Sequence, residues 1–176
     1  MGLVITISGK AESGKDTFAN CLKEILEKED KRVCIIHYAD YLKFIAEKYF
    51  NWNGKKDKCG RSLLQTLGTD VVRNRDYDFW VTNVSSFINI FLEDFDLFLI
   101  PDCRFPNEIE FMRNSHRTIS INIKRPDHAN SLTPFQRNHP SETALDNYEF
   151  DFDIPIRSGA SWVYSAAEEF LKEINI

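Results

Sequence analysis

Short runs of apolar residues alternate along the chain with stretches in which apolar residues recur every three or four positions. The short runs are rich in β-branched and aromatic residues, a composition that favours buried strands. We predict strands over residues 3–7, 32–37, 96–102, 117–124 and 150–156. The stretches between them have helical periodicity. They predict helices over residues 16–29, 40–50, 61–73, 79–92, 106–113 and 161–174.

Strands separated by helices favour an α/β fold in three layers, with helices on both faces of a parallel sheet. The length of 176 residues fits a single domain that spans residues 1–176. Two segments depart from simple alternation. Residues 40–92 insert extra helices between the second and third strands, and residues 125–148 are polar, irregular and too long for a simple connector. We expect the first to bind a substrate and the second, called here the lid-like segment, to act as a lid.

The first predicted strand runs into a loop bounded by glycines. Gly9, Gly14 and Lys15 have the spacing of a phosphate-binding loop, in which four residues separate the first glycine from a Gly-Lys pair. Glycine permits the backbone to turn its N–H groups toward an anion, and the following helix adds the positive end of its dipole. Lys15 would add a full charge for the β- and γ-phosphates. The alternative is an ordinary strand-to-helix turn that happens to contain these residues.

The residue after the lysine departs from the usual motif. Asp16 occupies the position of the common Ser or Thr, and the hydroxyl comes one residue later, at Thr17. Nucleoside monophosphate kinases often have this displaced threonine, so the pattern favours small-molecule phosphoryl transfer over GTPases and motor ATPases. Asp16 itself is either a metal ligand or an acidic residue that is favourable in the first helical turn.

Charge and cysteine usage narrow the class of protein. The formal net charge is −5, without a basic tail or stripe, so we expect no stable nucleic-acid partner. The four cysteines lack a metal-ligand spacing and indicate a reducing compartment. The chain begins directly with a strand, which argues against a secretory signal, and no apolar run is long enough to span a bilayer. We therefore predict a cytoplasmic protein without a membrane partner.

A second carboxylate follows the third predicted strand. Asp102 comes just after the apolar residues 97–100, so it would lie beside the phosphate loop if the two strands are neighbours. There it could hold Mg²⁺ through water, although an acidic residue is also common where a strand turns into a loop. Arginine can bind two phosphate oxygens at once. Arg104 next to Asp102, and Arg125 and Arg137 in the lid-like segment, are therefore candidate phosphate ligands.

Five segments in order along the chain carry a resemblance to a known family. They are SGKAESGKDT at 8–17, YADYLK at 38–43, LLQTLGTDVVRNRDYDFW at 63–80, PDCRFPNEIE at 101–110 and HPSETALDN at 139–147. In them the chain resembles the phage-type deoxynucleoside monophosphate kinases, a branch of the P-loop nucleoside monophosphate kinases. The resemblance implies the P-loop kinase fold with a five-stranded parallel sheet. It also implies transfer of the γ-phosphoryl group of ATP, with Mg²⁺, to a deoxynucleoside monophosphate.

The resemblance also implies roles for individual residues. Those with a catalytic role would be Lys15, Asp102, Arg104 and Arg137. Those that bind ATP would be Gly9, Lys10, Ala11, Glu12, Ser13, Gly14, Lys15, Asp16, Thr17 and Arg125. Those that bind the acceptor would be Asp40, Lys43, Arg73, Trp80, Arg104 and Glu142. Asp102, through water, and Asp16 would hold the metal. A catalytic base is not expected, because the acceptor phosphate is already an anion.

Several alternatives stay open at this point. Trp80 could be a core aromatic residue, and Arg104 could anchor its loop through Glu108. The helix over residues 79–92 could belong to the core or form a homodimer face. The chain could also be another small-molecule P-loop kinase, acting on a phosphorylated metabolite or on a modified base in DNA. The remaining alternative is a module that binds ATP without transferring phosphate.

Overall fold

A parallel β-sheet forms the centre of the protein. The computed structural model describes residues 2–126, 131–157 and 159–176, and within them the sheet has five strands in the order β2-β3-β1-β4-β5. The strands are β1 (Leu3–Ser8), β2 (Val33–Ile35), β3 (Leu97–Ile100), β4 (Thr118–Lys124) and β5 (Phe152–Pro155). All four pairings between neighbours are parallel. The predicted sheet is therefore confirmed, and each strand lies within or close to its expected range.

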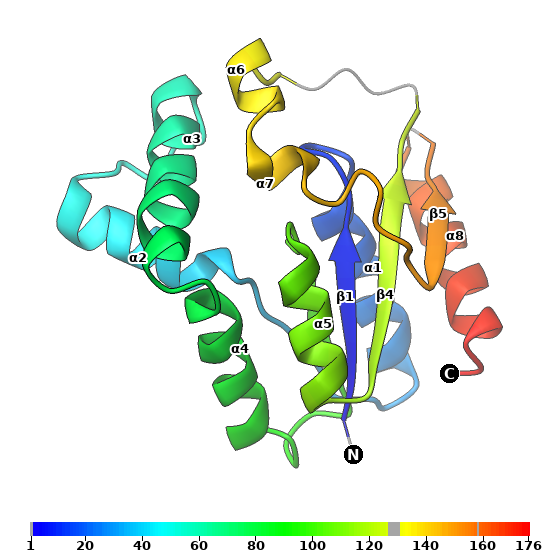
Figure 1. The fold of residues 1–176 in the computed structure, drawn as a ribbon. Helices are drawn as coiled ribbons and strands as arrows, with labels where there is room; N and C mark the ends of the chain where they lie inside the picture. Colours follow the sequence, from blue (N-terminus) through cyan, green and yellow to red (C-terminus); the bar gives the residue numbers. More distant parts are fainter. Residues whose placement is uncertain (1, 127–130, 158) are drawn as a thin grey trace.

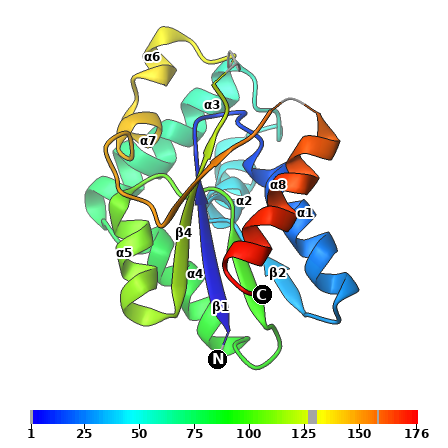
Figure 2. The ribbon, with the colours of Figure 1, turned by 90° about the vertical axis from the view of Figure 1, so that its right-hand side faces the viewer.

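Helices cover both faces of the sheet and make the three layers that the sequence predicts (Figures 1 and 2). One face carries α1 (Lys15–Lys28) and α8 (Ala160–Glu173). The other face carries α2 (Ala39–Phe50), α4 (Phe79–Ile90) and α5 (Pro106–Ser115).

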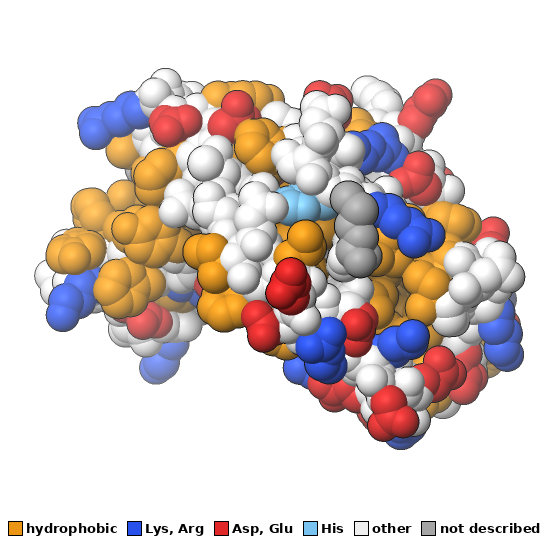
Figure 3. Space-filling view, turned by 90° about the horizontal axis from the view of Figure 1, so that it is seen from below, with side chains coloured by type: hydrophobic (Ala, Val, Ile, Leu, Met, Phe, Trp, Pro, Cys, Tyr) orange, Lys and Arg blue, Asp and Glu red, His pale blue; other side chains and the backbone are white. Residues whose placement is uncertain are grey.

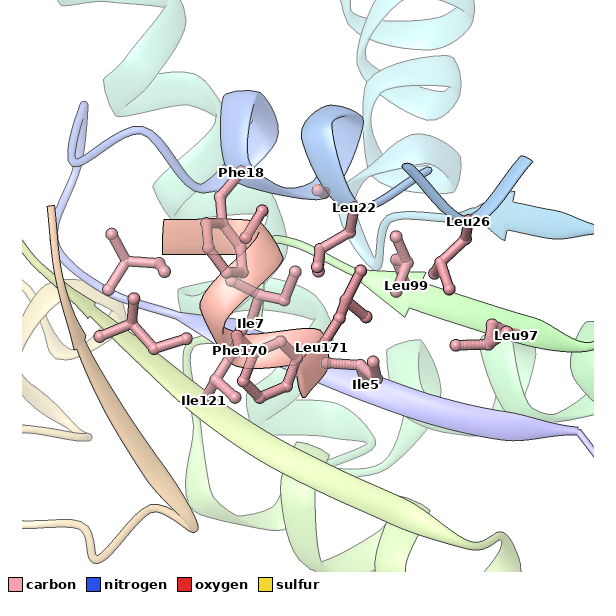
Figure 4. Close-up of a cluster of buried hydrophobic side chains, with 14 of the residues drawn as sticks. Ile5, Ile7, Phe18, Leu22, Leu26, Leu97, Leu99, Ile121, Phe170 and Leu171 are labelled. Atoms are coloured by element: carbon pink, nitrogen blue, oxygen red, sulfur yellow. The ribbon is translucent and has the colours of Figure 1, made fainter. Parts of the chain in front are cut away.

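Alternate residues of each strand point to opposite faces, so the sheet divides the hydrophobic core into two clusters. Ile5, Leu97 and Leu99 pack with α1 and α8, whereas Val4 and Phe98 pack with α2, α4 and α5. Figure 4 shows the first cluster, in which Phe18, Leu22 and Leu26 of α1 and Phe170 and Leu171 of α8 meet the strands.

The helical region between β2 and β3 differs from the prediction in one respect. A single helix was expected over residues 61–73, but the structure has an α-helix, α3 (Lys58–Gln65), that continues as a π-helix, η1 (Thr66–Arg73). The helix begins earlier than predicted because the Asp57 carboxylate accepts a hydrogen bond from the Gly60 N–H at 2.9 Å and caps its first turn. A π-helix is rare and is often found at functional sites. Helical periodicity alone does not distinguish it from an α-helix.

The lid-like segment is more regular than predicted. Its residues 127–130 lie outside the described part of the chain, and the part that is described contains two short helices, α6 (Pro134–Arg137) and α7 (Pro140–Thr143). Proline begins each of them, which suits the first helical position. The side chains of Thr133 and His139 accept N–H groups at the two helix starts.

The outer surface carries apolar side chains on one side. Figure 3 shows hydrophobic side chains gathered on the side where Figure 1 places α2 and α4. Exposed large residues of α2 include Tyr41, Phe44, Tyr49 and Phe50. Among the described helices, none combines the length and apolar character that a membrane span requires.

Candidate active site

The glycine-bounded loop lies between β1 and α1, at the carboxyl edge of the sheet (Figure 1). Gly9 has a φ of 140°, and a Cβ atom there would come within 2.6 Å of the Ile123 carbonyl oxygen. Gly14 has a φ of 97° just before α1, where a Cβ would meet nothing within 4 Å. Thus crowding and the positive φ both disfavour a side chain at Gly9, whereas at Gly14 the positive φ alone favours glycine.

Lys15 is buried at the start of α1, with 6% of its surface exposed. Its Nζ donates to the carbonyl oxygens of Gly9 at 2.9 Å and Lys10 at 2.7 Å. Burial, and then the positive charge of Arg104, lower the pKa of Lys15 to about 7. The side chain therefore lies inside the loop, in a place where a bound anion would stabilise its charge.

Asp102 connects the end of β3 to α2. One carboxylate oxygen accepts the Tyr38 N–H at 3.0 Å, and the other accepts the Ala39 N–H at 2.9 Å, at the beginning of α2. Within the described residues, no group of three or more His, Cys, Asp or Glu side chains could hold a metal ion. The carboxylates present, Asp102 among them, therefore fit Mg²⁺ only if phosphate oxygens and waters supply most of its ligands, as in nucleotide kinases. Asp102 would then contact the ion through water.

Two cavities are lined in part by the glycine-bounded loop. The first, of about 530 Å³, is lined by the loop, by the end of β4 including Asn122, and by the lid-like segment including Arg125. The second, of about 380 Å³, is lined by residues that include Lys15, Asp16, Lys43, Arg73 and Trp80. Among the described residues, the two cavities share Ala11, Arg104, Ser141 and Glu142.

Arg104 and Glu142 form the wall between the cavities. The Arg104 Nη1 lies 2.9 Å from Glu142 Oε1 and 3.3 Å from the Gly9 carbonyl oxygen. Glu142 Oε2 accepts the Ala11 N–H at 3.0 Å. The backbone N–H of Arg104, rather than its guanidinium, bonds to Glu108 at 2.7 Å. The loop anchor through Glu108 is therefore present, and it leaves the guanidinium directed at the phosphate loop.

The model of one protein family matches residues 25–154, and its description is deoxynucleotide monophosphate kinase. The match covers well over half of the chain. This chain belongs to the deoxynucleotide monophosphate kinase family. The resemblance inferred from the sequence is thereby confirmed, and the protein is an ATP-dependent phosphotransferase that acts on deoxynucleoside monophosphates.

Solved structures of other small-molecule kinases have the same fold. An APS kinase from Mycobacterium tuberculosis in complex with AMPPNP and APS is 10% identical, with a TM-score of 0.61, over 99% of this chain and 98% of that one. Dephospho-CoA kinase from Campylobacter jejuni is 12% identical, with a TM-score of 0.54, over 97% and 96% of the two chains. At such identities the likeness shows the fold alone. No curated protein sequence matches the chain.

In this kinase, Arg73 is part of a buried network at the end of η1. Its Nη2 lies 2.5 Å from Glu108 Oε1, its Nη1 donates to Asn107 at 2.7 Å, and the guanidinium lies 3.8 Å from the centre of the Phe105 ring. Burial raises the pKa of Glu108 to about 7, while Arg73 opposes that rise. Arg73 thus holds the start of α5 and, at the same time, forms part of the second cavity's wall.

Trp80 also belongs to this scaffold. It is buried, and its Nε1 donates to the Gly68 carbonyl oxygen at 2.9 Å, so the indole is held against η1. Its core role and its place on the wall of the second cavity are compatible, because the ring lines that cavity while its N–H is already bonded.

His37 lines the second cavity, although the sequence analysis did not single it out. Its Nε2 lies 2.8 Å from Asp16 Oδ1, and its Nδ1 lies 3.4 Å from Asp40 Oδ2. The hydrogen bond that the Asp16 carboxylate accepts from the His37 ring raises the pKa of His37 and lowers that of Asp16. A histidine at the end of the second predicted strand is a signal available in the sequence, because strand ends meet at the site.

Three predicted residues lie further from the cavities. Arg137 is exposed on α6 and donates to the Leu132 carbonyl oxygen at 3.0 Å, and it is not among the residues that line either cavity. Asp40 pairs with Lys43 at 2.9 Å and likewise does not line them. Thr17 is exposed in the first turn of α1.

Proposed function

We propose that the first cavity binds the nucleoside part of ATP and the second binds the deoxynucleoside monophosphate. The phosphoryl group would pass between them at Ala11, Arg104, Ser141 and Glu142. The observation that carries this proposal is that two cavities meet at the phosphate-binding loop and share these four residues. A kinase needs such an arrangement, because donor and acceptor must approach in line from opposite sides.

The loop and Lys15 would hold the phosphates of ATP, together with Gly9, Lys10, Ala11, Glu12, Ser13, Gly14, Asp16 and Thr17. Two observations support the fit of a phosphate chain. The Ser13 hydroxyl is buried without a hydrogen-bond partner among the described residues, and the space beside Gly14 is open. Arg125 lines the first cavity, where it could contact the donor nucleotide. Mg²⁺ would supply positive charge to the phosphate oxygens, with Asp102 and Asp16 beside it.

The acceptor would lie against Lys43, Arg73 and Trp80 in the second cavity, near Asp40. Catalysis would consist of positioning and charge neutralisation by Lys15 and Arg104, because the acceptor phosphate is itself the nucleophile. Arg137 would join them only if the lid-like segment shifts when nucleotide binds. The structure supports this proposal by the closeness of the segment to the loop, through Lys10 and Glu142.

An acceptor screen tests which deoxynucleoside monophosphates the kinase accepts. The kinase is supplied with ATP and Mg²⁺ and with each natural deoxynucleoside monophosphate in turn, and ADP formation is measured. We expect one or a few acceptors to stimulate ADP formation strongly. Stimulation only by unrelated phosphorylated metabolites, or by DNA that contains modified bases, would replace the proposed acceptor. Tight ATP binding without any acceptor-dependent ADP would indicate a non-catalytic module.

Replacement of the loop lysine tests the donor side. We expect Lys15→Ala to lower turnover by orders of magnitude, because its charge is aimed at the place of the transferred phosphoryl group. Lys23→Ala is the matched control, since Lys23 lies on the same helix and pairs with Glu27 at its surface. Equal turnover of the Lys15 variant and the control in a coupled ADP assay would contradict the assignment.

We also propose a homodimer and a cytoplasmic location. The exposed aromatic residues on α2 support the first, whereas α4 is mostly committed to the core through Trp80, Val81, Val84 and Ile88. The proposed dimer face would therefore consist of exposed residues of α2 together with those of residues 79–92. Sedimentation velocity over a range of concentrations decides between a monomer and a dimer.

A further inference from the structure

The side chain of Glu142 lies where the two cavities meet, on donors that an anion would use. Its Oε2 accepts the Ala11 N–H of the phosphate loop at 3.0 Å, and its Oε1 lies 2.9 Å from the Arg104 guanidinium. The side chain is 7% exposed, so the carboxylate is held away from bulk water. It reaches the loop from 131 residues further along the chain.

The backbone around Glu142 is also fastened to the loop. The Lys10 Nζ donates to the Glu142 carbonyl oxygen at 2.6 Å and pairs with Asp146, which comes four residues later. A buried side chain, that of His139, caps the short helix α7 that carries Glu142. The carboxylate is thus presented to the loop by a docked segment, and its position does not depend on a freely moving side chain.

A carboxylate and a phosphate group use the same partners. Both accept hydrogen bonds from backbone N–H groups, and both form short charge-assisted bonds with a guanidinium. A phosphoryl group at the junction would need the Ala11 N–H and Arg104, which Glu142 already uses. Two anions cannot share these donors without strong repulsion. Binding of one therefore requires the departure of the other.

We infer that Glu142 is an internal competitor of the nucleotide phosphates, bound to the loop until the donor nucleotide displaces it. The inference rests on the proposed function, in which the phosphoryl group passes between the cavities at Ala11 and Arg104. Glu142 would release Arg104 to the nucleotide as it leaves. It would also return when the product departs, so that the loop donors and Arg104 are not left without an anion.

Competition of this kind weakens the apparent binding of phosphate. The apparent dissociation constant is the intrinsic one divided by the fraction of molecules in which Glu142 is off the loop. If about nine molecules in ten have Glu142 on the loop, removal of the carboxylate tightens phosphate binding about tenfold. A residue that merely positions Arg104 for catalysis would have the opposite effect, since its loss would weaken binding or leave it unchanged while turnover falls.

Binding of inorganic tripolyphosphate, measured by calorimetry at constant ionic strength without Mg²⁺, tests the inference. We expect Glu142→Gln to bind it several-fold more tightly than the unmodified kinase, and Glu142→Ala about tenfold more tightly. Glu149→Gln is the matched control, because it removes one negative charge at an exposed position close to the same segment without freeing the Ala11 N–H or Arg104. It should tighten binding much less. Unchanged or weaker binding by both Glu142 variants overturns the inference, and so does equal tightening by the control.

A crystal structure of the unmodified kinase with tripolyphosphate gives a test that does not depend on the folding of variants. A phosphate oxygen should accept the Ala11 N–H, with the Glu142 carboxylate moved out of hydrogen-bond distance. Tripolyphosphate bound in the loop with Glu142 still on Ala11 would refute the competition. Neither test uses an acceptor. Failure of the acceptor screen would therefore reject the proposed function alone, and a failed tripolyphosphate test alongside normal turnover would reject this inference alone.

Discussion

At the scale of single residues, the site gathers charged groups whose burial and pairing alter their ionisation. Lys15 and Glu108 have pKa values moved toward neutrality mainly by burial, whereas His37 and Asp16 are shifted by each other. The shifts of Lys15 and Glu108 favour their neutral forms. The shifts of His37 and Asp16 favour their charged forms, which have opposite signs. Phosphate binding would raise the pKa of Lys15 again, because a nearby anion favours the protonated amine.

The pair of His37 and Asp16 predicts a pH-dependent contribution to stability. The pKa of His37 is raised in the folded protein, because its hydrogen bond with Asp16 and then the charges of Asp102 and Asp40 outweigh burial and the repulsion from Lys43. A raised pKa stabilises the fold fully below the unfolded value, about 6.5, and the effect is lost as the pH rises through the folded pKa. The lowered pKa of Asp16 keeps its carboxylate charged throughout this range.

We therefore expect His37→Asn to lower the free energy of unfolding by about 0.5 to 1 kcal/mol at about pH 5.5 and by much less at about pH 9. The value is small because the side chain of Asp16 is 69% exposed, so solvent screens the pair. Urea unfolding of both proteins at the two pH values measures the difference. The same loss at both pH values would mean that packing, rather than charge, holds His37.

At the scale of elements, α3 shows how close packing can reverse the usual preference of a helix for alanine over glycine. Alanine normally stabilises a helix relative to glycine by about 1 kcal/mol. A Cβ at Gly60 would come within 2.0 Å of the Lys55 carbonyl oxygen and 2.6 Å of the Trp52 Nε1, which are themselves bonded to each other. Glycine is therefore required here by the close approach of the preceding loop.

We expect Gly60→Ala to destabilise the protein by about 1 to 3 kcal/mol, because the loop that contains Lys55 must move. Cys59→Ala, at the exposed neighbouring position of the same helix, is the control and should change stability by less than about 0.5 kcal/mol. Thermal and urea unfolding compare the two variants. A Gly60→Ala protein as stable as the control would show that the loop yields without cost.

The lid-like segment is an element whose role depends on its contacts. Gln136 of α6 is buried and donates to the Lys58 carbonyl oxygen at 3.1 Å, and Glu12 of the phosphate loop accepts the Ser131 N–H at 3.0 Å. The segment therefore connects the phosphate loop with α3. Its length predicts a lid, and these contacts place the described part of it against the site.

At the scale of the whole molecule, one buried cluster is nearly separate from the site. Among the described residues, the cluster between the sheet and the helices α1 and α8 shares Ile123 with the first cavity and none with the second. We expect Leu26→Ala, which empties a fully buried position near the end of α1, to cost about 2 to 5 kcal/mol. Leu26→Met keeps the volume and should cost less than about 1.5 kcal/mol.

Turnover per folded molecule should remain unchanged in both Leu26 variants, because Leu26 lies at the end of α1 away from the phosphate loop. Urea unfolding gives the stability, and the coupled ADP assay at low temperature gives the turnover. A fall in turnover without unfolding would show that the packing of α1 also sets the position of Lys15.

The sequence by itself determined the features that depend on near neighbours. Alternating apolar runs located all five strands, and the spacing of Gly9, Gly14 and Lys15 located the phosphate loop. Family membership also followed from local motifs. These signals are readable because periodicity, turn chemistry and motif spacing each act over a few residues.

The tertiary structure alone decided which distant groups meet. Glu142 bonds to Ala11 across 131 residues, Asp102 to Ala39 across 63, and Arg73 to Glu108 across 35. It also decided that residues 66–73 form a π-helix. A polar side chain has many partners of suitable chemistry along the chain, and only the packing of the sheet and its helices brings one of them within hydrogen-bond distance.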